Sequence, residues 1–486
     1  MNAPIMRLYV LALILFATLV GFTSYWAVFK SEELKEKPEN RRALIEAQGI
    51  KRGTITTVDG TVVAESIAQG KGQQTIYSRR YPQGDLFGHP VGYSFIEVGQ
   101  SEIERSENTT LTGESNEFAN LIDELQGETE EGSNVTLTLD AEAQRVATQA
   151  LESAITTPET GGAVVAIEPD TGAIRAMVST PGYDPNTVPT DFESLTSDEG
   201  ETPLVNRPTQ SVYPPGSTMK VVTATAALDS GEFEQSTTLN ANSGIDVSGV
   251  PLANSGGQDF GTIDMTTALT NSVNTYWAQV GEQLGPETMV EYMKRFGFFR
   301  KPPVDFPSDE LTASGVFNSD RELVEEGFDV GRVAIGQGGE EGQILATELQ
   351  MAMVAATVAN EGTLMEPTFQ QEVTDPDGRT SEELDPEEFS EVMSADTAGQ
   401  MADMMTNVAE EGTASGLSVA GSTLAGKTGT AEIDVESSLN QAQFIGFAPA
   451  DDPQIAVAAT VERCTGCFGG DTAGPIATQV MESLLD

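Results

Sequence analysis

Three short motifs that lie far apart in the sequence constrain the fold more than any other feature, because they make chemical sense only if they meet. They are Ser217-Thr218-Met219-Lys220, Ser272-Val273-Asn274 and Lys427-Thr428-Gly429. In this order they are typical of a serine acyl-transfer site that uses lysine as its base and needs no histidine. We therefore expect a fold that brings the start of a helix and the edge of a strand together at one site.

The first motif is predicted to place a serine at a helix N-terminus. The segment Tyr213-Pro214-Pro215-Gly216 ends regular structure, and apolar residues with helical spacing follow. Free backbone N–H groups at a helix start favour a developing anion at Ser217. Lys220 lies one turn further on, so its amine can reach the Ser217 hydroxyl. Taken alone, this motif fits an ordinary capping serine with a surface lysine equally well.

The second motif gains its meaning from its position. The pattern Ser-x-Asn also begins at Ser106 and at Ser438. Ser272 and Asn274 carry weight because they lie between the two lysine motifs, with helical sequence on both sides. We expect the Ser272 hydroxyl to relay a proton between Lys220 and the leaving group. We expect Asn274 to hold the substrate amide and the lysine together.

The third motif is predicted to supply a cation and a strand that binds substrate. Lys427 would lower the pKa of Lys220 by repulsion and would bind a substrate carboxylate. Gly429 has no side chain, so an extended substrate can pair with this strand edge. The backbone N–H groups of Ser217 and Thr430 form the predicted oxyanion hole. A plain exposed turn is the alternative interpretation of this stretch.

Other catalytic arrangements fit the sequence poorly. A Ser-His-Asp triad would need the single histidine, His89, which lies before the predicted linker, and no Gly-x-Ser-x-Gly motif surrounds Ser217. The stretch Ile335-Gly336-Gln337-Gly338-Gly339 lacks the lysine of a phosphate-binding loop, and we interpret it as a backbone turn near the site. One histidine and one Cys-x-x-Cys pair cannot provide four zinc ligands, so no metal site is predicted. Cys464 and Cys467 are expected to form a local disulfide in an oxidising exterior.

The N-terminal segment predicts a membrane anchor. Residues 8–29 carry no formal charge, which is long enough for one helical span of a bilayer. Arg7 precedes the segment and acid-rich sequence follows Lys30, so the positive-inside rule predicts a cytoplasmic N-terminus with the rest outside. A cleaved signal peptide is the alternative, but the stretch is longer than usual and lacks a small-residue cleavage site. The formal net charge of −50 argues against nucleic acid as a partner and predicts a densely hydrated acidic surface.

Hydrophobic patterning predicts an α+β fold after this anchor. A charged stalk is expected at 31–48, a mixed region with a hairpin (54–58 and 61–64) up to about residue 129, and a linker at 126–132. Beyond the linker, the expected strands are 134–139, 163–167 with 173–178, and 443–448 with 455–461. One helix is expected to be capped by Asp140 and to run toward Leu151. Further helices are expected at 218–228, 345–360 and 397–409, and a last one from Pro475. Two separated hairpins around a helical middle indicate an antiparallel sheet with helices on its faces.

These residues together resemble the class B penicillin-binding proteins, the monofunctional peptidoglycan D,D-transpeptidases, and most of all the actinobacterial PbpA type. Further segments that carry the resemblance are Met1-Asn2-Ala3-Pro4-Ile5, Tyr81-Pro82-Gln83-Gly84, His89-Pro90-Val91-Gly92-Tyr93, Asn206-Arg207 and Ala334-Ile335-Gly336-Gln337-Gly338. The resemblance implies a cytoplasmic stub and transmembrane anchor at 1–30, an elongated pedestal or dimerisation-like domain at 31–145, and a penicillin-binding transpeptidase domain at 146–486.

The resemblance also implies roles for the motif residues. Ser217 would be the acylated nucleophile, Lys220 its base, Ser272 and Asn274 the second motif, and Lys427-Thr428-Gly429-Thr430 the substrate-binding strand. The implied reaction cleaves the terminal D-Ala–D-Ala bond of a stem peptide and passes the acyl group to an amine on a neighbouring stem. β-Lactams would acylate the same serine. The implied partner is a membrane glycosyltransferase of the RodA/FtsW kind, and no cofactor is expected.

Three alternatives remain open from the sequence. A D,D-carboxypeptidase or a β-lactam-hydrolysing relative would use water as the acceptor, and the motifs alone do not separate this from transfer. A bifunctional class A enzyme would need a glycosyltransferase domain, for which the region before the linker is too short. A β-lactam sensor or a non-catalytic cell-wall scaffold with a decayed site is disfavoured because all three motifs are intact.

Overall fold

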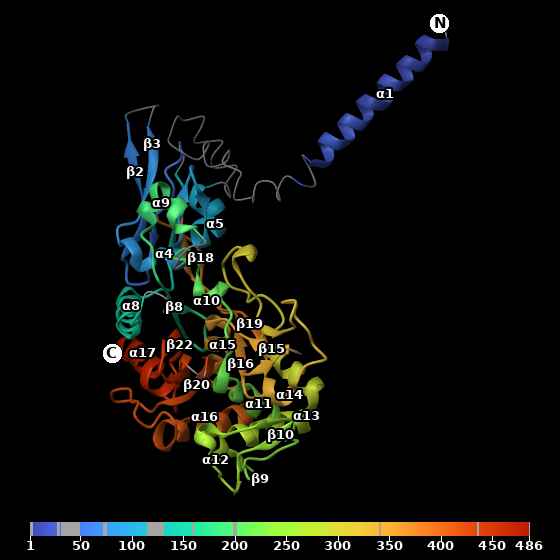
Figure 1. The fold of residues 1–486 in the computed structure, drawn as a ribbon. Coiled ribbons are helices and arrows are strands. Elements are labelled where there is room, and N and C mark those ends of the chain that lie inside the picture. The colour runs from blue at the N-terminus through green and yellow to red at the C-terminus, as the bar shows by residue number, and fades with distance from the viewer. Residues whose placement is uncertain are drawn as a thin grey trace.

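The computed structural model describes residues 3–26, 30, 49–70, 75–113, 131–157, 160–197, 202–339, 342–434 and 437–485. The molecule is elongated, with an apolar helix at one end, a six-stranded sheet next to it, and a five-stranded sheet with most of the helices at the other end (Figure 1). The predicted stalk at 31–48 and most of the predicted linker at 126–132 lie outside the described residues.

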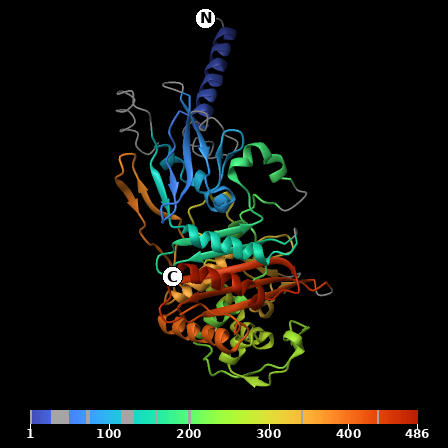
Figure 2. The ribbon, with the colours of Figure 1, turned by 90° about the vertical axis from the view of Figure 1, so that its left-hand side faces the viewer.

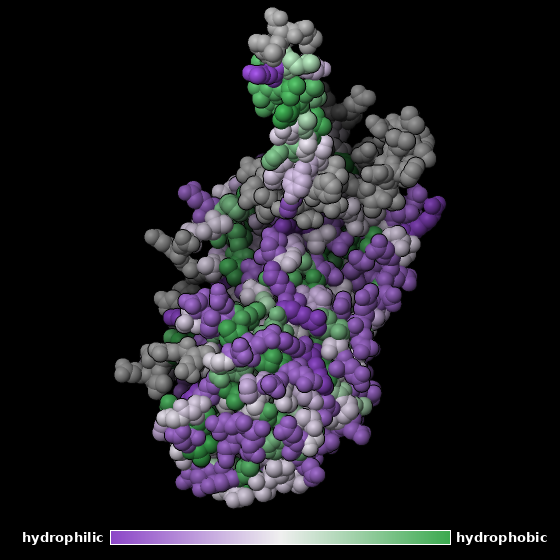
Figure 3. Space-filling view, turned by 90° about the vertical axis from the view of Figure 1, so that its right-hand side faces the viewer, coloured by the Kyte–Doolittle hydropathy of each residue, from purple (hydrophilic) through white to green (hydrophobic). Residues whose placement is uncertain are grey.

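The helix α1 (Ala3–Ser24) is isolated from the rest of the chain. Its segment Met6–Ser24 is long and apolar enough to cross a membrane, and none of it is buried against the protein. Helix α1 begins and ends about five residues before the predicted span at 8–29 does. Figure 3 shows this apolar helix above a surface that is mostly hydrophilic, with small apolar areas between.

The six-stranded sheet runs in the order β18-β17-β6-β1-β2-β3. Its strands are β1 (Ile55–Thr56), β2 (Val62–Gln69), β3 (Ile76–Arg80), β6 (Asn134–Leu137), β17 (Gln370–Thr374) and β18 (Thr380–Glu383). The predicted hairpin is present as the antiparallel pair β1 and β2, while β6 lies parallel to β1. β17 and β18 come from much later in the chain and complete the sheet beyond β6, which the sequence analysis did not predict.

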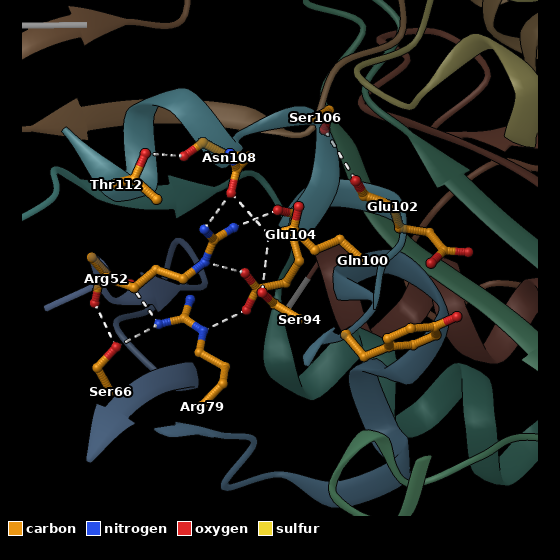
Figure 4. A network of polar contacts seen from close by, with 12 residues as sticks. Arg52, Ser66, Arg79, Ser94, Gln100, Glu102, Glu104, Ser106, Asn108 and Thr112 are labelled. Atoms are coloured by element: carbon orange, nitrogen blue, oxygen red, sulfur yellow. Dashed lines mark hydrogen bonds and ion pairs between the residues drawn. The ribbon is translucent and has the colours of Figure 1, made fainter. Parts of the chain in front are cut away.

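A buried ionic cluster holds this part together. Glu104, in α5 (Glu102–Ser106), is fully buried. Its carboxylate forms one ion pair with Arg52 at 2.7 Å and another with Arg79 at 2.5 Å. Arg52 also donates to the Asn108 side chain at 2.6 Å, and Arg79 donates to the Gly53 carbonyl at 2.7 Å. Both guanidinium groups thus converge on one carboxylate (Figure 4).

The five-stranded sheet is antiparallel throughout, in the order β20-β21-β22-β7-β8. Its strands are β7 (Gly162–Ile167), β8 (Ile174–Thr180), β20 (Ala425–Asp434), β21 (Leu439–Ala448) and β22 (Ile455–Thr465). Both hairpins predicted beyond residue 160 are confirmed, and the pairing of β22 with β7 joins them. Every residue of β7 is buried, so helices cover both faces of the sheet.

Two groups of helices pack on this sheet. α8 (Ala141–Ala154) and α17 (Gly474–Leu485) pack against one another and on the strands, as do α15 (Glu348–Ala359) and α16 (Ala395–Glu411). Figure 2 shows the sheet between the upper six-stranded part and the helices below. As predicted, Asp140 caps α8, accepting from the Ala143 backbone N–H at 2.8 Å. A domain boundary at 145/146 falls within α8.

Four helical elements lie at or next to the first two motifs. They are the 3₁₀ turn η6 (Gly216–Met219), α11 (Lys220–Asp229), α12 (Met265–Thr270) and α13 (Asn274–Arg295). The first eight residues of α11 are all buried, so this helix is the core of the motif-bearing part.

The remaining elements are short. They are η3 (Gly84–Phe87), α4 (Gly88–Val91), β4 (Ser94–Phe95), β5 (Gly99–Gln100), α6 (Asn108–Thr112), η5 (Pro185–Thr187), α9 (Val188–Leu195), α10 (Arg207–Gln210), β9 (Leu239–Asn240), β10 (Ile245–Val247), β11 (Val250–Leu252), η7 (Ser255–Gly257), β12 (Thr262–Ile263), η8 (Ser308–Glu310), β13 (Gly315–Phe317), α14 (Val330–Val333), β14 (Gly338–Gly339), β15 (Gly342–Leu345), β16 (Thr363–Met365), β19 (Glu388–Glu391) and η9 (Gly469–Ala473).

Candidate active site

The serine of the first motif lies within reach of its lysine. Ser217 is in the turn η6, and Lys220 begins α11 with its side chain fully buried. The Lys220 Nζ atom lies 3.0 Å from the Ser217 Oγ atom. The structure therefore brings the predicted nucleophile and the predicted base into direct hydrogen-bonding contact.

The glycine-rich stretch at 335–339 packs against this turn. The Gly216 backbone N–H donates to the Gly336 carbonyl at 3.0 Å. A Cβ atom on Gly336 would lie 1.7 Å from the Gly216 carbonyl oxygen, and its φ of +76° favours glycine as well. The predicted backbone turn near the site is thus present, and glycine is needed there for close approach.

The second motif surrounds the Lys220 amine. Besides Ser217, Nζ contacts the Ser272 carbonyl at 2.8 Å, the Ser272 hydroxyl at 3.2 Å and the Asn274 Oδ1 atom at 2.7 Å. The Asn274 Nδ2 atom donates to the Ala253 carbonyl at 3.2 Å, which orients Oδ1 toward the lysine. The carbonyl and amide oxygens can only accept, so they take two N–H groups of a neutral amine. The lone pair is then left for a hydroxyl proton.

Ser272 adopts an uncommon backbone conformation between α12 and α13. Its φ is +55°, in the left-handed region that non-glycine residues seldom occupy. This conformation points both its carbonyl and its hydroxyl at the Lys220 amine. Strain of this kind is found where the surrounding structure fixes a functional group.

The third motif brings a second buried amine to the same hydroxyl. The Lys427 side chain is fully buried, and its Nζ atom lies 2.9 Å from the Ser272 Oγ atom and 2.9 Å from the Thr428 carbonyl. Ser272 thus bridges the two lysines. Both contacts of Lys427 are within the protein and its side chain is buried, so the expected contact with a substrate carboxylate stays a prediction.

Burial controls the protonation of both lysines. Burial lowers the pKa of Lys220 well below its usual value, and repulsion from Lys427 lowers it further. Burial also lowers the pKa of Lys427 to about 7. Every partner that the described residues offer to either amine is a hydroxyl, carbonyl or amide oxygen. The predicted effect of Lys427 is present, but burial is the larger cause.

The substrate-binding strand predicted from the third motif is β20, an edge strand of the five-stranded sheet. Thr428 contacts the Thr413 hydroxyl at 2.5 Å, a partner that the sequence analysis missed. A Cβ atom on Gly429 would lie 2.9 Å from Thr218 Cγ2 and 3.0 Å from the Pro215 carbonyl. Glycine is therefore required here for approach of the serine turn, and the pairing of substrate with this strand edge stays a prediction.

Thr430 lies beside the serine turn. A Cβ atom on Gly216 would lie 3.1 Å from the Thr430 carbonyl oxygen and 3.4 Å from its nitrogen. The two segments whose backbone N–H groups form the predicted oxyanion hole are thus neighbours. The Gly469 backbone N–H donates to the Thr430 hydroxyl at 3.2 Å, another contact that sequence reasoning missed.

The Cys464–Cys467 disulfide lies between β22 and η9, close to this strand. The Asn440 side chain donates to the Cys467 carbonyl at 3.0 Å. His89 is in α4, away from the motifs, and contacts the Pro203 carbonyl at 2.8 Å; burial lowers its pKa to about 4. Among the described residues, no group of three or more His, Cys, Asp and Glu side chains forms a candidate metal site.

Comparison with known proteins agrees with this geometry. Residues 162–482 match the family model described as the penicillin binding protein transpeptidase domain, and residues 52–135 match the penicillin binding protein A dimerisation domain. The chain is 32% identical to the peptidoglycan D,D-transpeptidase PbpA of Mycolicibacterium smegmatis and 30% identical to that of Mycobacterium tuberculosis, covering 100% of this chain and 99% of the relative in each case.

Solved structures with a similar fold come from the same family. Penicillin-binding protein A from M. tuberculosis, in an acyl-enzyme complex with ceftriaxone, superposes with a TM-score of 0.80 at 29% identity, covering 91% of this chain and 100% of that one. A D,D-transpeptidase domain from Eggerthella lenta gives a TM-score of 0.76 at 30% identity, covering 90% of this chain and 98% of that one.

Proposed function

Because the chain belongs to the penicillin-binding protein transpeptidase family, we propose that Ser217 is the residue that forms its acyl-enzyme. The chain is a serine-type peptidoglycan D,D-transpeptidase and a target of β-lactams. The observation that carries the assignment of Ser217 is the buried Lys220 amine 3.0 Å from its hydroxyl oxygen. A buried amine that lacks a carboxylate partner is readily neutral and can act as the general base.

In the acylation step, Lys220 accepts the Ser217 proton as Oγ attacks the carbonyl carbon of the penultimate D-alanine. The backbone N–H groups of Ser217 and Thr430 stabilise the oxyanion. The C–N bond to the terminal D-alanine breaks, and its amine takes a proton that Lys220 passes through the Ser272 hydroxyl. An ester to Ser217 and free D-alanine result. Lys427 holds Ser272 in place through its 2.9 Å contact.

In the second step, the amine of a neighbouring stem peptide attacks the ester. Lys220, neutral again, accepts a proton from this amine and returns one to the Ser217 oxygen as the ester bond breaks. Asn274 orients the donor amide and the lysine, and the edge strand β20 pairs with the extended stem peptide. A β-lactam follows the first step only, because its leaving amine stays attached.

We also propose a placement for the chain. Helix α1 is the single membrane span, with the N-terminus in the cytoplasm, and residues 146–486 carry the chemistry outside, on a pedestal formed by residues 31–145. A membrane glycosyltransferase of the RodA/FtsW kind would contact α1 and this pedestal. Co-purification of that partner with the full chain, and its loss when α1 is replaced by an unrelated membrane helix, tests this part.

Labelling with a fluorescent penicillin tests the assignment of Ser217. Wild-type protein should become labelled, Ser217→Ala should not, and Ser230→Ala, at the far end of α11, should label like wild type. Persistent labelling of Ser217→Ala contradicts the assignment. Incubation with a D-Ala–D-Ala donor and an amine acceptor then separates transfer from hydrolysis, since a carboxypeptidase releases D-alanine without forming the acyl–amine product.

A further inference from the structure

Strand β22 ends in a β-bulge beside the active site. Asn440 of β21 pairs with Cys464, and Ala442 pairs with Val461, so two residues of β22 oppose one residue of β21 between these pairs. The two are Glu462 and Arg463, and Arg463 has a φ of +49°. A bulge bends the strand and changes the direction of its side chains.

The side chain of Glu462 contacts the segment that leads to the catalytic serine. Its Oε1 atom lies 3.0 Å from the Arg207 Nε atom and accepts a hydrogen bond from the Tyr213 hydroxyl. The Arg207 and Glu462 side chains are 9% and 16% exposed, so this is a largely buried ion pair. Burial, and next the Glu462 charge, raise the pKa of Tyr213 well above its usual value, so its hydroxyl remains a donor.

The backbone on both sides of this contact is fixed. The Glu462 backbone N–H donates to the Gly161 carbonyl at 2.8 Å, which anchors the bulge to the neighbouring chain. Tyr213 exchanges two backbone hydrogen bonds with Ala346, at 2.9 and 2.8 Å. The Gln443 side chain of β21 donates to the Pro214 carbonyl at 2.9 Å. The segment from Tyr213 to Ser217 is therefore held between β21, β22 and the connection before α15.

The same strand end also leads to the other half of the site. A few residues after Glu462 come the disulfide and Gly469, whose backbone N–H donates to the Thr430 hydroxyl. The stretch from Glu462 to Gly469 thus contacts Tyr213, which precedes the Ser217 turn, and also contacts Thr430. It therefore links the two segments that carry the proposed oxyanion donors.

We propose that Glu462 is a positioning residue, which acts through Tyr213 and Arg207 to set the Ser217 turn against Thr430. The proposal rests on the assignment of Ser217 as the nucleophile. Glu462 contacts no substrate and exchanges no proton; it holds the nucleophile where attack and oxyanion stabilisation coincide. A displacement of about 1 Å in such a geometry can cost about 100-fold in rate.

The chain offers a matched control for a test of this role. Tyr292 donates to Asp229 at 2.8 Å, and Arg295 lies 3.5 Å from the same carboxylate. This is the same combination of tyrosine, carboxylate and arginine, at the far end of α11 from Lys220. Tyr292→Phe therefore removes an equivalent hydroxyl without touching the segment that carries the nucleophile.

The experiment measures acylation by a penicillin over a range of concentrations, which separates the dissociation constant of the first complex from the acylation rate constant. For Tyr213→Phe, we expect the rate constant to fall about 10-fold or more, while the dissociation constant stays within about twofold. Its melting temperature should fall no further than that of Tyr292→Phe. A rate constant within about twofold of wild type, or an equal loss in Tyr292→Phe, overturns the proposal.

A second variant tests whether the two residues act as one unit. Glu462→Gln keeps an oxygen acceptor and the side-chain shape but removes the charge. The double variant with Tyr213→Phe should lose no more rate than the worse single variant, whereas losses that multiply overturn the proposal. If Glu462→Gln does not fold, Tyr213→Phe decides alone. Labelling that persists in Ser217→Ala would instead refute the proposed function, so the two failures are distinguishable.

Discussion

Two places in this molecule bury a pair of cationic side chains, and only one of them buries a carboxylate with the pair. In the N-terminal region, Arg52 and Arg79 share the fully buried Glu104 (Figure 4). In the proposed active site, Lys220 and Lys427 share the hydroxyl of Ser272. The first arrangement balances its charge with an acid, and the second relies on neutral oxygens.

The difference decides what each cluster can do. Burial alone would raise the pKa of Glu104, but Arg79 and Arg52 outweigh it and hold the value below the usual one. That cluster therefore keeps fixed charges and is structural. Burial lowers the pKa values of both lysines, with Lys427 adding to the effect on Lys220. A buried cation whose partners are all neutral releases its proton, and this makes the second cluster reactive.

The largest effect should come from making the active-site cation permanent. Lys220→Arg places a group in the site that does not lose its proton at any accessible pH, so the base is removed. Acylation by a fluorescent penicillin should slow by about 10³-fold or more at every pH. Lys294→Arg, a surface lysine paired with Glu325, should acylate like wild type. A rate for Lys220→Arg that recovers at high pH would contradict the role of Lys220 as the base.

The second test removes the acid from the N-terminal cluster. Glu104→Gln leaves two buried guanidinium groups without a counter-charge, which should lower the free energy of unfolding by about 3–5 kcal/mol. The exposed pair of Arg80 with Glu65 provides the control, because Glu65→Gln should cost less than about 1 kcal/mol. Denaturant unfolding measures both variants. Equal losses in the two would show that the cluster contributes no more than a surface ion pair.

The third test adds an acid to the active site. Asn274→Asp places a carboxylate where Oδ1 now lies 2.7 Å from the Lys220 amine, so the site comes to resemble the N-terminal cluster. The pKa of Lys220 should rise and acylation at neutral pH should slow by about 10²-fold, with recovery as the pH increases. The pH profile of the acylation rate measures this shift. The control Asn407→Asp, on α16, should leave the pH profile unchanged. An unchanged profile in Asn274→Asp as well would contradict the role of charge balance in the site.

The smallest effect per pH unit concerns the opposite case from the lysine pair, a buried acid without a cation. Burial raises the pKa of Glu348, at the start of α15, to about 8. The folded state then binds this proton more tightly than the unfolded state, so the contribution of Glu348 to stability is greatest in acid and is lost as the pH rises from about 4.5 to about 8. The slope should reach about 1.4 kcal/mol per pH unit. Thermal unfolding of Glu348→Gln should show a flatter pH dependence than wild type, while the exposed Glu410→Gln should not.

The sequence predicted the members of the active site better than their surroundings. Lysine is scarce in this chain, and Ser217, Lys220, Ser272 and Lys427 occur in a recognisable order. The structure brings them together at hydrogen-bonding distances. Glu462 was not predicted, because the chain contains 75 acidic residues and nothing in the sequence distinguishes this glutamate from the others. Its contact with Tyr213 depends on a bulge, which no local pattern of side chains reveals.

The fold was predictable where pattern and pairing are local. The hairpins of β7 with β8 and of β21 with β22 follow from alternating apolar residues around proline- and glycine-containing turns. The addition of β17 and β18 to the six-stranded sheet could not be predicted, because β17 pairs with β6 from a distant part of the chain and β18 then pairs with β17. Gly429 shows a subtler limit: the motif predicted a strand edge open to substrate, whereas the packing of this glycine against the serine turn is seen only in the structure.

The late strands of the six-stranded sheet have a consequence for how the chain is made. β6 ends at Leu137, and the strand that covers it begins at Gln370. During synthesis the chain emerges N-terminus first at about 5–20 residues per second. One edge of β6 therefore stays unpaired until the chain between Leu137 and Gln370, which includes Ser217, has been synthesised. A nascent chain that stops before Gln370 displays an unpaired strand, the kind of surface on which chains aggregate and chaperones bind.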